Sequence, residues 1–411
     1  MHPRIVWAIG CGQLINWGIT YFAFSVLLVP LEQSFDAPRW LVAGAFSFGL
    51  LMSALVAPAI GRLADRGQGP AVMQAGGLIA AALLFAWAAI PTLSMTYVVW
   101  ALLGLCMAAI LYEPVFAIVG RAIGDPDGRM RAIATVTVMG GLASSAFLPG
   151  TAALVNRWGW RGAVVVLGAL MAITTMIVGR IAFRDLEWSA QTIRTAMRSE
   201  AGERASEPLT GLNRYVVIFA ISSVVNSAVA SNLVAALIDG GFASTMAATV
   251  AGSFGIMQLP GRLLMTNRRF TPKPAPLIVF SFALQIAGLI ALMLHGRLAL
   301  AAGVMIFAAG AGLTTLARPY WVLHAYGAGR AGYANGVIAR GQQIARAAGP
   351  VSAAAMATTT GYAAVFAALA VFLVAASGLT WPRNRLGAAG TAGTTGTTGT
   401  AGTAGTPGPR K

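Results

Sequence analysis

The stretch GRLADRGQGP, residues 61–70, carries three charged side chains, Arg62, Asp65 and Arg66, together with three glycines. The runs on either side of it, 40–61 and 67–112, contain no Asp, Glu, Lys or Arg. A helix needs about 20 apolar residues to cross the hydrocarbon core of a bilayer, and each run is long enough for that. We therefore interpret residues 61–70 as a charged, tight connection between membrane-spanning helices.

The composition of the whole chain agrees with a membrane protein. Of its 411 residues, 57% are hydrophobic and only 10% are charged, whereas a soluble domain carries about 25% charged residues. The mean hydropathy is +0.74. A formal net charge of +16 raises the possibility of a nucleic-acid partner, but such binding needs basic residues gathered into a patch. Here the arginines lie scattered between apolar runs and form no such patch. We therefore expect a lipid bilayer as partner and no nucleic acid.

Long stretches without Asp, Glu, Lys or Arg recur along the chain, and a final apolar region is broken only by Arg340 and Arg346. Two stretches are too long for one span, and we place a turn in each, at Ile90–Ser94 and at Thr358–Tyr362. The total is twelve predicted transmembrane helices in an all-α protein. The stretches are 5–31, 40–61, 67–112, 132–156, 162–179, 215–238, 240–261, 274–296, 298–317 and 331–382.

The distribution of basic residues predicts the orientation. With the N-terminus inside, the short connections on the cytoplasmic side hold eleven Arg and Lys residues, and those on the opposite side hold four. The positive-inside rule then places both termini in the cytoplasm. The first apolar run is too long for a cleaved signal peptide and serves as the first helix. We expect a multi-pass protein of a bacterial inner membrane, and a monomer.

Two related halves are expected. The only long polar interruption falls between the sixth and seventh spans, and the tripeptide Gly-Arg-Leu at 61–63 recurs at 261–263, each time at the same end of the second helix of its half. Internal repeats of this kind are how transporters build a substrate site between halves. The predicted units are a six-helix half at 1–183, a cytoplasmic loop at 184–213, a second six-helix half at 214–382, and a disordered Gly/Thr/Ala-rich cytoplasmic tail at 383–411.

Twelve spans, the 6+6 division and the loop after the second helix together resemble the major facilitator superfamily, over roughly residues 4 to 382. The loop pattern of that family, G-x-L-a-D-r-x-G-r, is matched by Gly61, Leu63, Asp65 and Arg66 and, one position late, by Gly69. The fourth and fifth helices depart from the drug-antiporter branch of the family. The opening stretch, NWGITYFAFSVLLVPLEQSFDAPRW, is similar, more loosely, to the branch that carries monocarboxylates and exchanges oxalate for formate.

The resemblance implies a conformational latch at this loop, in which the aspartate holds the two halves together on the cytoplasmic side. Carried over, Asp65 would contact the start of the eleventh helix and Arg121 at the end of the fourth. Gly61 and Gly67 would let the backbone turn and approach a neighbour, while Arg62 and Arg66 hold the loop in the cytoplasm. The alternative is a solvated turn without a partner.

Charges inside spans mark candidate sites for substrate or protons. Such a residue costs about 2.5 to 3.5 kcal/mol at the centre of a span, so it usually faces a partner or a wet cavity. Glu113 and Arg318 should lie at similar depth on the fourth and tenth helices, which the resemblance places across the cavity from each other. They could pair in the empty carrier, with an anionic substrate competing for the arginine while the glutamate takes a proton. A purely structural salt bridge is the alternative.

The eleventh helix carries Arg340 and Arg346, six residues apart and therefore on different faces. We expect one of them near the cytoplasmic rim and Arg346 deeper, toward the cavity or a neighbouring helix. Bonding to helix-end carbonyls is as good an account. Polar side chains on the first helix should also point inward, because polar groups facing lipid are disfavoured. Whether they contact substrate or glue helices together stays open. These residues are Gln13, Asn16 and Thr20, with Trp17 and Tyr21 beside them and Ser223 and Asn226 answering on the seventh helix.

The sequence favours a secondary active transporter that moves a small organic molecule, preferably a monocarboxylate-like anion, by proton-linked symport or exchange. The two lysines fit no P-loop, and Cys11 and Cys106 have no C-x-x-C spacing. We expect no metal, no cofactor and no enzymatic activity. The alternatives are a drug or metabolite efflux carrier of the same superfamily and, from another class, a non-transporting membrane sensor or scaffold.

Overall fold

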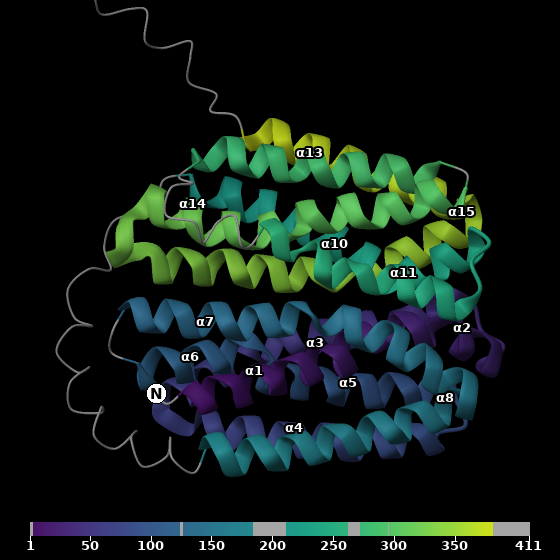
Figure 1. The fold of residues 1–411 in the computed structure, drawn as a ribbon, viewed down its shortest axis with the longest axis horizontal. Coiled ribbons are helices and arrows are strands. Elements are labelled where there is room, and N and C mark those ends of the chain that lie inside the picture. Colours follow the sequence, from purple (N-terminus) through teal and green to yellow (C-terminus); the bar gives the residue numbers. More distant parts are fainter. Residues whose placement is uncertain (1–2, 124–125, 184–210, 262–271, 295, 381–411) are drawn as a thin grey trace, which may run out of the picture. The chain divides into compact units, whose positions relative to one another are not determined.

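The computed structural model describes residues 3–123, 126–183, 211–261, 272–294 and 296–380. Some side chains within those ranges are not described, among them those of Asp65, Glu113 and Arg121. The described part is built from helices joined by short connections, without a strand (Figure 1). The fold class predicted from the sequence, an all-α membrane protein, is therefore confirmed. The predicted loop and tail fall largely outside the described residues, and the boundaries of the four units stay predictions.

Helices of the first half follow the apolar runs closely. They are α1 (Pro3–Trp17), η1 (Gly18–Phe22), α2 (Ala23–Phe35), α3 (Arg39–Leu63), η2 (Ala64–Gln68), α4 (Gly69–Ala89), α5 (Leu93–Ile110), α6 (Tyr112–Ala122), α7 (Pro126–Gly141), α8 (Ala143–Val178) and η3 (Gly179–Phe183). The second half repeats the pattern with α10 (Leu212–Asp239), α11 (Ser244–Met257), α13 (Pro274–Met293), α14 (Arg297–Arg346) and α15 (Ala348–Thr380).

Nine helical segments of the described residues are long and apolar enough to cross a membrane. Nine segments are compatible with twelve spans, because two segments hold two spans each and one span is too short to be counted. Two of the segments, Arg131–Ala182 and Val337–Thr380, are each long enough for two crossings, at about 20 residues per crossing. The helix of one further span, α11, has 14 residues and so falls below that length.

Turns between spans lie where the sequence predicts them. The helix α4 ends at Ala89 and α5 begins at Leu93, within the predicted turn at Ile90–Ser94. The predicted turn at Thr358–Tyr362 is found at Gly361, which has φ +79°. Gly159, at φ +68°, divides α8 between the fifth and sixth spans. Only glycine adopts such backbone angles without strain, and this fixes both hairpins.

Helices pack both within each predicted half and across the two. Within the first half α3 packs on α5 and α4 on α8, and within the second α13 packs on α14 and α10 on α15. The halves meet through α8 with α11, α3 with α15, and α2 with α10. Many large apolar side chains remain exposed, including Trp7, Val98 and Leu298, as expected where lipid is the solvent.

We call the two ends of the bundle the Arg39 end, where α2 meets α3, and the Arg62 end, where α3 meets α4.

Candidate functional site

The charged connection at the Arg62 end turns at Gly67, whose φ is +85°. The tight turn predicted at Gly67 is therefore found there. The close approach predicted at Gly61 is wrong, because a Cβ there would meet nothing within 4 Å. It is found instead at Gly69, where a Cβ would lie 2.8 Å from Cγ1 of Ile118. Arg62 is exposed. The side chains of Asp65 and Arg121 lie outside the described part, so the latch stays a prediction.

The fourth span is broken near its middle. Leu111 is extended, with φ −84° and ψ −158°, and separates α5 from α6. Pro114 lacks a backbone N–H, so the carbonyl of Ile110, four residues earlier, has no helical partner. Two amides of the first helix donate to that carbonyl instead, Gln13 Nε2 at 2.6 Å and Asn16 Nδ2 at 3.1 Å. Both side chains are buried, so part of the polar stripe of the first helix joins helices within its half.

The eleventh span shows the same chemistry. Pro350 removes the N–H that would pair with the carbonyl of Arg346, and the chain passes from α14 to α15 beside it. The hydroxyl of Ser227 on α10 donates to this carbonyl at 2.8 Å. Asn232, five residues further along α10, donates to the carbonyl of Pro350 at 3.3 Å. Both sides of the break are thus held by polar groups of α10.

Tyr21 lies in η1, a five-residue π-helical segment of the first helix. Its ring is buried against the edges of Trp17, at 5.4 Å between ring centroids, and Phe46, at 5.5 Å. Arg346 of the second half is close enough to Tyr21 for an electrostatic interaction between the two side chains. The structure therefore brings together two predicted site residues from opposite halves. π-helical segments occur frequently at functional sites.

Arg318 points toward the eleventh span. Its guanidinium donates to the side-chain oxygen of Gln342, whose amide in turn donates to the carbonyl of Phe219 at 3.4 Å. Arg340 is exposed, while Arg346 is half-buried. Whether Arg318 pairs with Glu113 stays a prediction, because the side chain of Glu113 is not described.

Asn226 belongs to a separate polar network within the second half. Its amide donates to Oε1 of Gln285 at 3.2 Å, and Nε2 of Gln285 donates to Thr314 at 2.8 Å. Thr314 also donates to Ser281 at 3.0 Å. Gln285 and Ser281 are fully buried. This network ties α10, α13 and α14 together, as polar groups do between helices in lipid.

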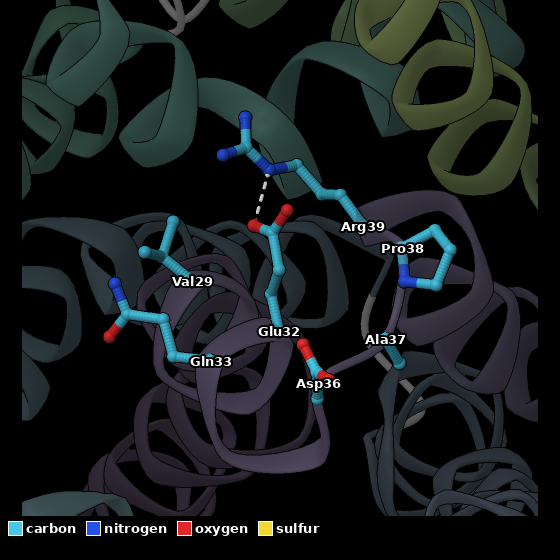
Figure 2. A pocket seen from close by; sticks show the side chains of 7 residues that line it. All are labelled: Val29, Glu32, Gln33, Asp36, Ala37, Pro38 and Arg39. Atoms are coloured by element: carbon cyan, nitrogen blue, oxygen red, sulfur yellow. Dashed lines mark hydrogen bonds and ion pairs between the residues drawn. The ribbon is translucent and has the colours of Figure 1, made fainter.

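A cluster at the Arg39 end was missed by the sequence interpretation. Arg39, the first residue of α3, donates to Glu32 at 2.8 Å and to Asp239, the last residue of α10, at 3.0 Å. It also donates to the hydroxyl of Tyr362 at 3.4 Å. Figure 2 shows Arg39 reaching over Glu32 beside a pocket that Asp36 also lines. The sequence did contain a signal for it: Arg39 lies at the start of a helix, which disfavours a cation, and Asp239 lies at the end of a helix, which disfavours an anion.

No group of His, Cys, Asp or Glu that could hold a metal ion occurs among the residues described. Cys11 is exposed and Cys106 is buried, and both are free thiols. Two regions of the described structure contain polar or charged groups that could bind a ligand or control transport. One is the region between the halves with Tyr21, Arg318 and Arg346, and the other is the charged cluster at the Arg39 end.

Comparison with known proteins gives the same fold. Residues 6–199 match the model of the Major Facilitator Superfamily. The structure is similar, at TM-score 0.71 and 15% identity, to a bacterial homologue of the human lysosomal transporter Spinster in an inward-facing, occupied conformation, over 92% of this chain and 97% of that one. The human organic anion transporter MFSD10 gives TM-score 0.64 and 15% identity over 93% and 100% of the two chains. No curated protein sequence matches significantly.

A third similar structure is the nucleoside transporter NupG, with TM-score 0.68 and 14% identity over 92% of this chain and 98% of that chain. The broken, polar-lined spans therefore belong to a fold that this chain shares with solved membrane transporters. The chain thus matches the Major Facilitator Superfamily over residues 6–199 and shares the fold of these transporters, and it is a multi-pass membrane protein.

Proposed function

We propose that the protein is a secondary active transporter that carries a small organic anion, with a monocarboxylate as the favoured class, by alternating access of its two halves. The observation that supports this most is the position of Arg346. It is a half-buried cation of the second half that lies within electrostatic range of Tyr21 in the first. A cation held inside a span marks a pathway for ligand or ions, and its proximity to the other half suits a ligand bound between them.

A second arginine supports the choice of an anion. Arg318 is held by Gln342, which lies one turn before Arg346 on the same helical span. A carboxylate entering between the halves would therefore meet two guanidinium groups, and guanidinium binds carboxylate with good geometry. The similar structures carry different substrates, since one is named for organic anions and another for nucleosides. The fold alone does not select among these substrates, so the proposal rests on the arginines.

Proton coupling is the favoured energy source, and exchange of one anion for another is the other mode. Glu113, in the first turn of α6, is the candidate proton carrier. We propose that the protein lies in a bacterial inner membrane with both termini in the cytoplasm, on the evidence of its basic connections.

A transport assay tests the proposal. Purified protein would first be screened by thermal shift against lactate, formate, oxalate and uncharged metabolites, because a ligand that binds the folded state raises the melting temperature. Proteoliposomes would then be assayed for saturable, protonophore-sensitive uptake of the radiolabelled carboxylate that gave the largest shift. We expect Arg318→Gln and Arg346→Gln to abolish uptake at unchanged abundance. Arg297→Gln is the matched control, since Arg297 lies at the Arg39 end, where it donates to the carbonyl of Gly241 and lies over the ring of Phe242. Uptake of an uncharged metabolite alone, or carboxylate uptake unaffected by both substitutions, would refute the proposal.

A further inference from the structure

The charged cluster at the Arg39 end joins the two halves of the molecule. Glu32 and Arg39 both belong to the first half and lie seven residues apart across the turn between α2 and α3. Asp239 and Tyr362 belong to the second half, and Arg39 contacts both of them. One arginine therefore makes a bond that persists when the halves separate and two contacts that separation must break.

Both charges of the inter-half pair stand at unfavourable helix ends. Arg39 is the first residue of α3, where the partial positive charge of the helix disfavours a cation. Asp239 is the last residue of α10, where the partial negative charge disfavours an anion. Neither charge therefore stabilises its own helix. Bringing the two together offsets both penalties, so the contact is favoured only while this end of the molecule is closed.

The pair is accessible enough to be reversible. The side chain of Asp239 is 48% exposed and that of Arg39 is 16% exposed. An ion pair with this much solvent contact shifts an equilibrium by at most about fivefold. A carrier must open and close each end repeatedly, and a weak pair suits that requirement better than a buried one would.

Polar contacts continue from this cluster into the membrane-spanning region. The hydroxyl of Tyr362 donates to Oδ1 of Asn232 at 3.4 Å. Asn232 in turn donates to the carbonyl of Pro350, beside the break that carries Arg346. Two more hydrogen bonds join the halves in the same region, from Val351 N–H to Ser47 at 3.1 Å and from Val234 N–H to Ser25 at 3.5 Å.

We propose that Arg39 and Asp239 form a reversible latch that closes the Arg39 end of the transporter, with Glu32 holding Arg39 in position. The latch lies at the opposite end from the connection at residues 61–70, where the Asp65 latch is predicted. Opening of the Arg39 end releases Asp239 to water, while Arg39 remains bound to Glu32. The inference rests on the proposed alternating access and adds to it the residues that close this end.

Cysteine labelling tests the latch without any substrate. The chain has two cysteines, so a background with Cys11→Ala and Cys106→Ala leaves Ser47→Cys as the single reporter. Ser47 is 7% exposed, against Val351 of the other half. We expect Arg39→Gln and Asp239→Asn each to raise the rate of labelling by a membrane-impermeant maleimide about twofold to fivefold, in vesicles oriented with the Arg39 end outside. The double variant should label no faster than the faster single variant.

Arg161→Gln is the matched control, because Arg161 binds Ser34 and the carbonyl of Ile90 within the first half at the same end. Its labelling rate should equal that of the background protein. A second reporter, Ser25→Cys, is fully buried against α10 and replaces Ser47→Cys if that variant does not fold. Unchanged labelling in both latch variants, an equal rise in the control, or additive effects in the double variant would overturn the latch.

The two proposals fail separately. Faster labelling of the latch variants in a protein that carries no carboxylate would retain the latch and refute the substrate class. If the protein takes up carboxylate but the Arg39 and Asp239 variants leave the labelling rate unchanged, the latch alone would be refuted.

Discussion

Ser227 donates its hydroxyl to the backbone carbonyl of Arg346 at 2.8 Å, and Pro350 is the reason that this carbonyl is available. A carbonyl left without a donor in a half-buried site destabilises the fold by about 1 kcal/mol or more. We expect Ser227→Ala to lower the apparent melting temperature of the detergent-purified protein. Pro350→Ala restores an N–H four residues after Arg346, so the double variant should recover part of the loss. Losses that simply add would show that the hydroxyl and the proline are unrelated.

Tyr21 lies within electrostatic range of Arg346, and its hydroxyl can be removed without removing the ring contacts. In Tyr21→Phe the edge contacts with Trp17 and Phe46 remain, so we expect unchanged abundance. The KM for the transported carboxylate should rise about fivefold, the equivalent of one hydrogen bond. Tyr97→Phe is the control, because the hydroxyl of Tyr97 bonds to the carbonyl of Leu41 within the first half; its KM should not change. Equal KM values for Tyr21→Phe and the parent protein would remove Tyr21 from the site.

Asp65 is the acidic member of the connection at the Arg62 end. If it latches the halves there, Asp65→Asn should reduce the uptake rate while leaving the amount of protein in the membrane unchanged. Gln68→Ala, an exposed position of the same connection, should have no effect. The comparison uses initial uptake rates normalised to membrane abundance. An Asp65→Asn variant with the parental rate would support a solvated turn.

Gly104 allows α5 to approach α3 closely. A Cβ at this position would lie 2.0 Å from the carbonyl oxygen of Gly49, and a backbone atom cannot move aside as a side-chain tip can. We expect Gly104→Ala to destabilise the protein by about 1 to 3 kcal/mol, as overpacking does. Gly378→Ala has no atom within 4 Å of the new Cβ and should be neutral. Equal melting temperatures for the two variants would contradict the close packing of α3 and α5.

Hydropathy and turn chemistry are local, and they predicted the spans and their connections well. The turn at Ile90 and the break at Gly361 follow from interrupted apolar runs and from the conformational freedom of glycine. The π-helical segment at Gly18–Phe22 and the extended residue at Leu111 were not predicted, because they depend on tertiary packing. The sequence raised the possibility that the polar stripe of the first helix glues helices. It did not identify Ile110, 97 residues from Gln13, as the group that the stripe contacts.

The candidate site was predicted less completely than the fold. The sequence placed Arg346 deep on the eleventh span, toward the cavity or a neighbouring helix, and the structure adds Tyr21 as a side chain within its electrostatic range. Arg39 was counted only as one of four basic residues on its side of the membrane. Its partner Asp239 lies 200 residues away, so only a three-dimensional arrangement reveals the pair.

The wide turn at Gly18–Phe22 has a consequence for how the first helix can evolve. A π-helical turn contains one residue more than an α-helical turn would, and one residue corresponds to about 100° of rotation at 3.6 residues per turn. The amides that hold Ile110 therefore belong to one segment of the first helix. The phenol of Tyr21 belongs to a second segment, which is rotated about the helix axis relative to the first. Deleting a single residue between them would turn one of these groups toward lipid, so this short segment should not tolerate a change in length.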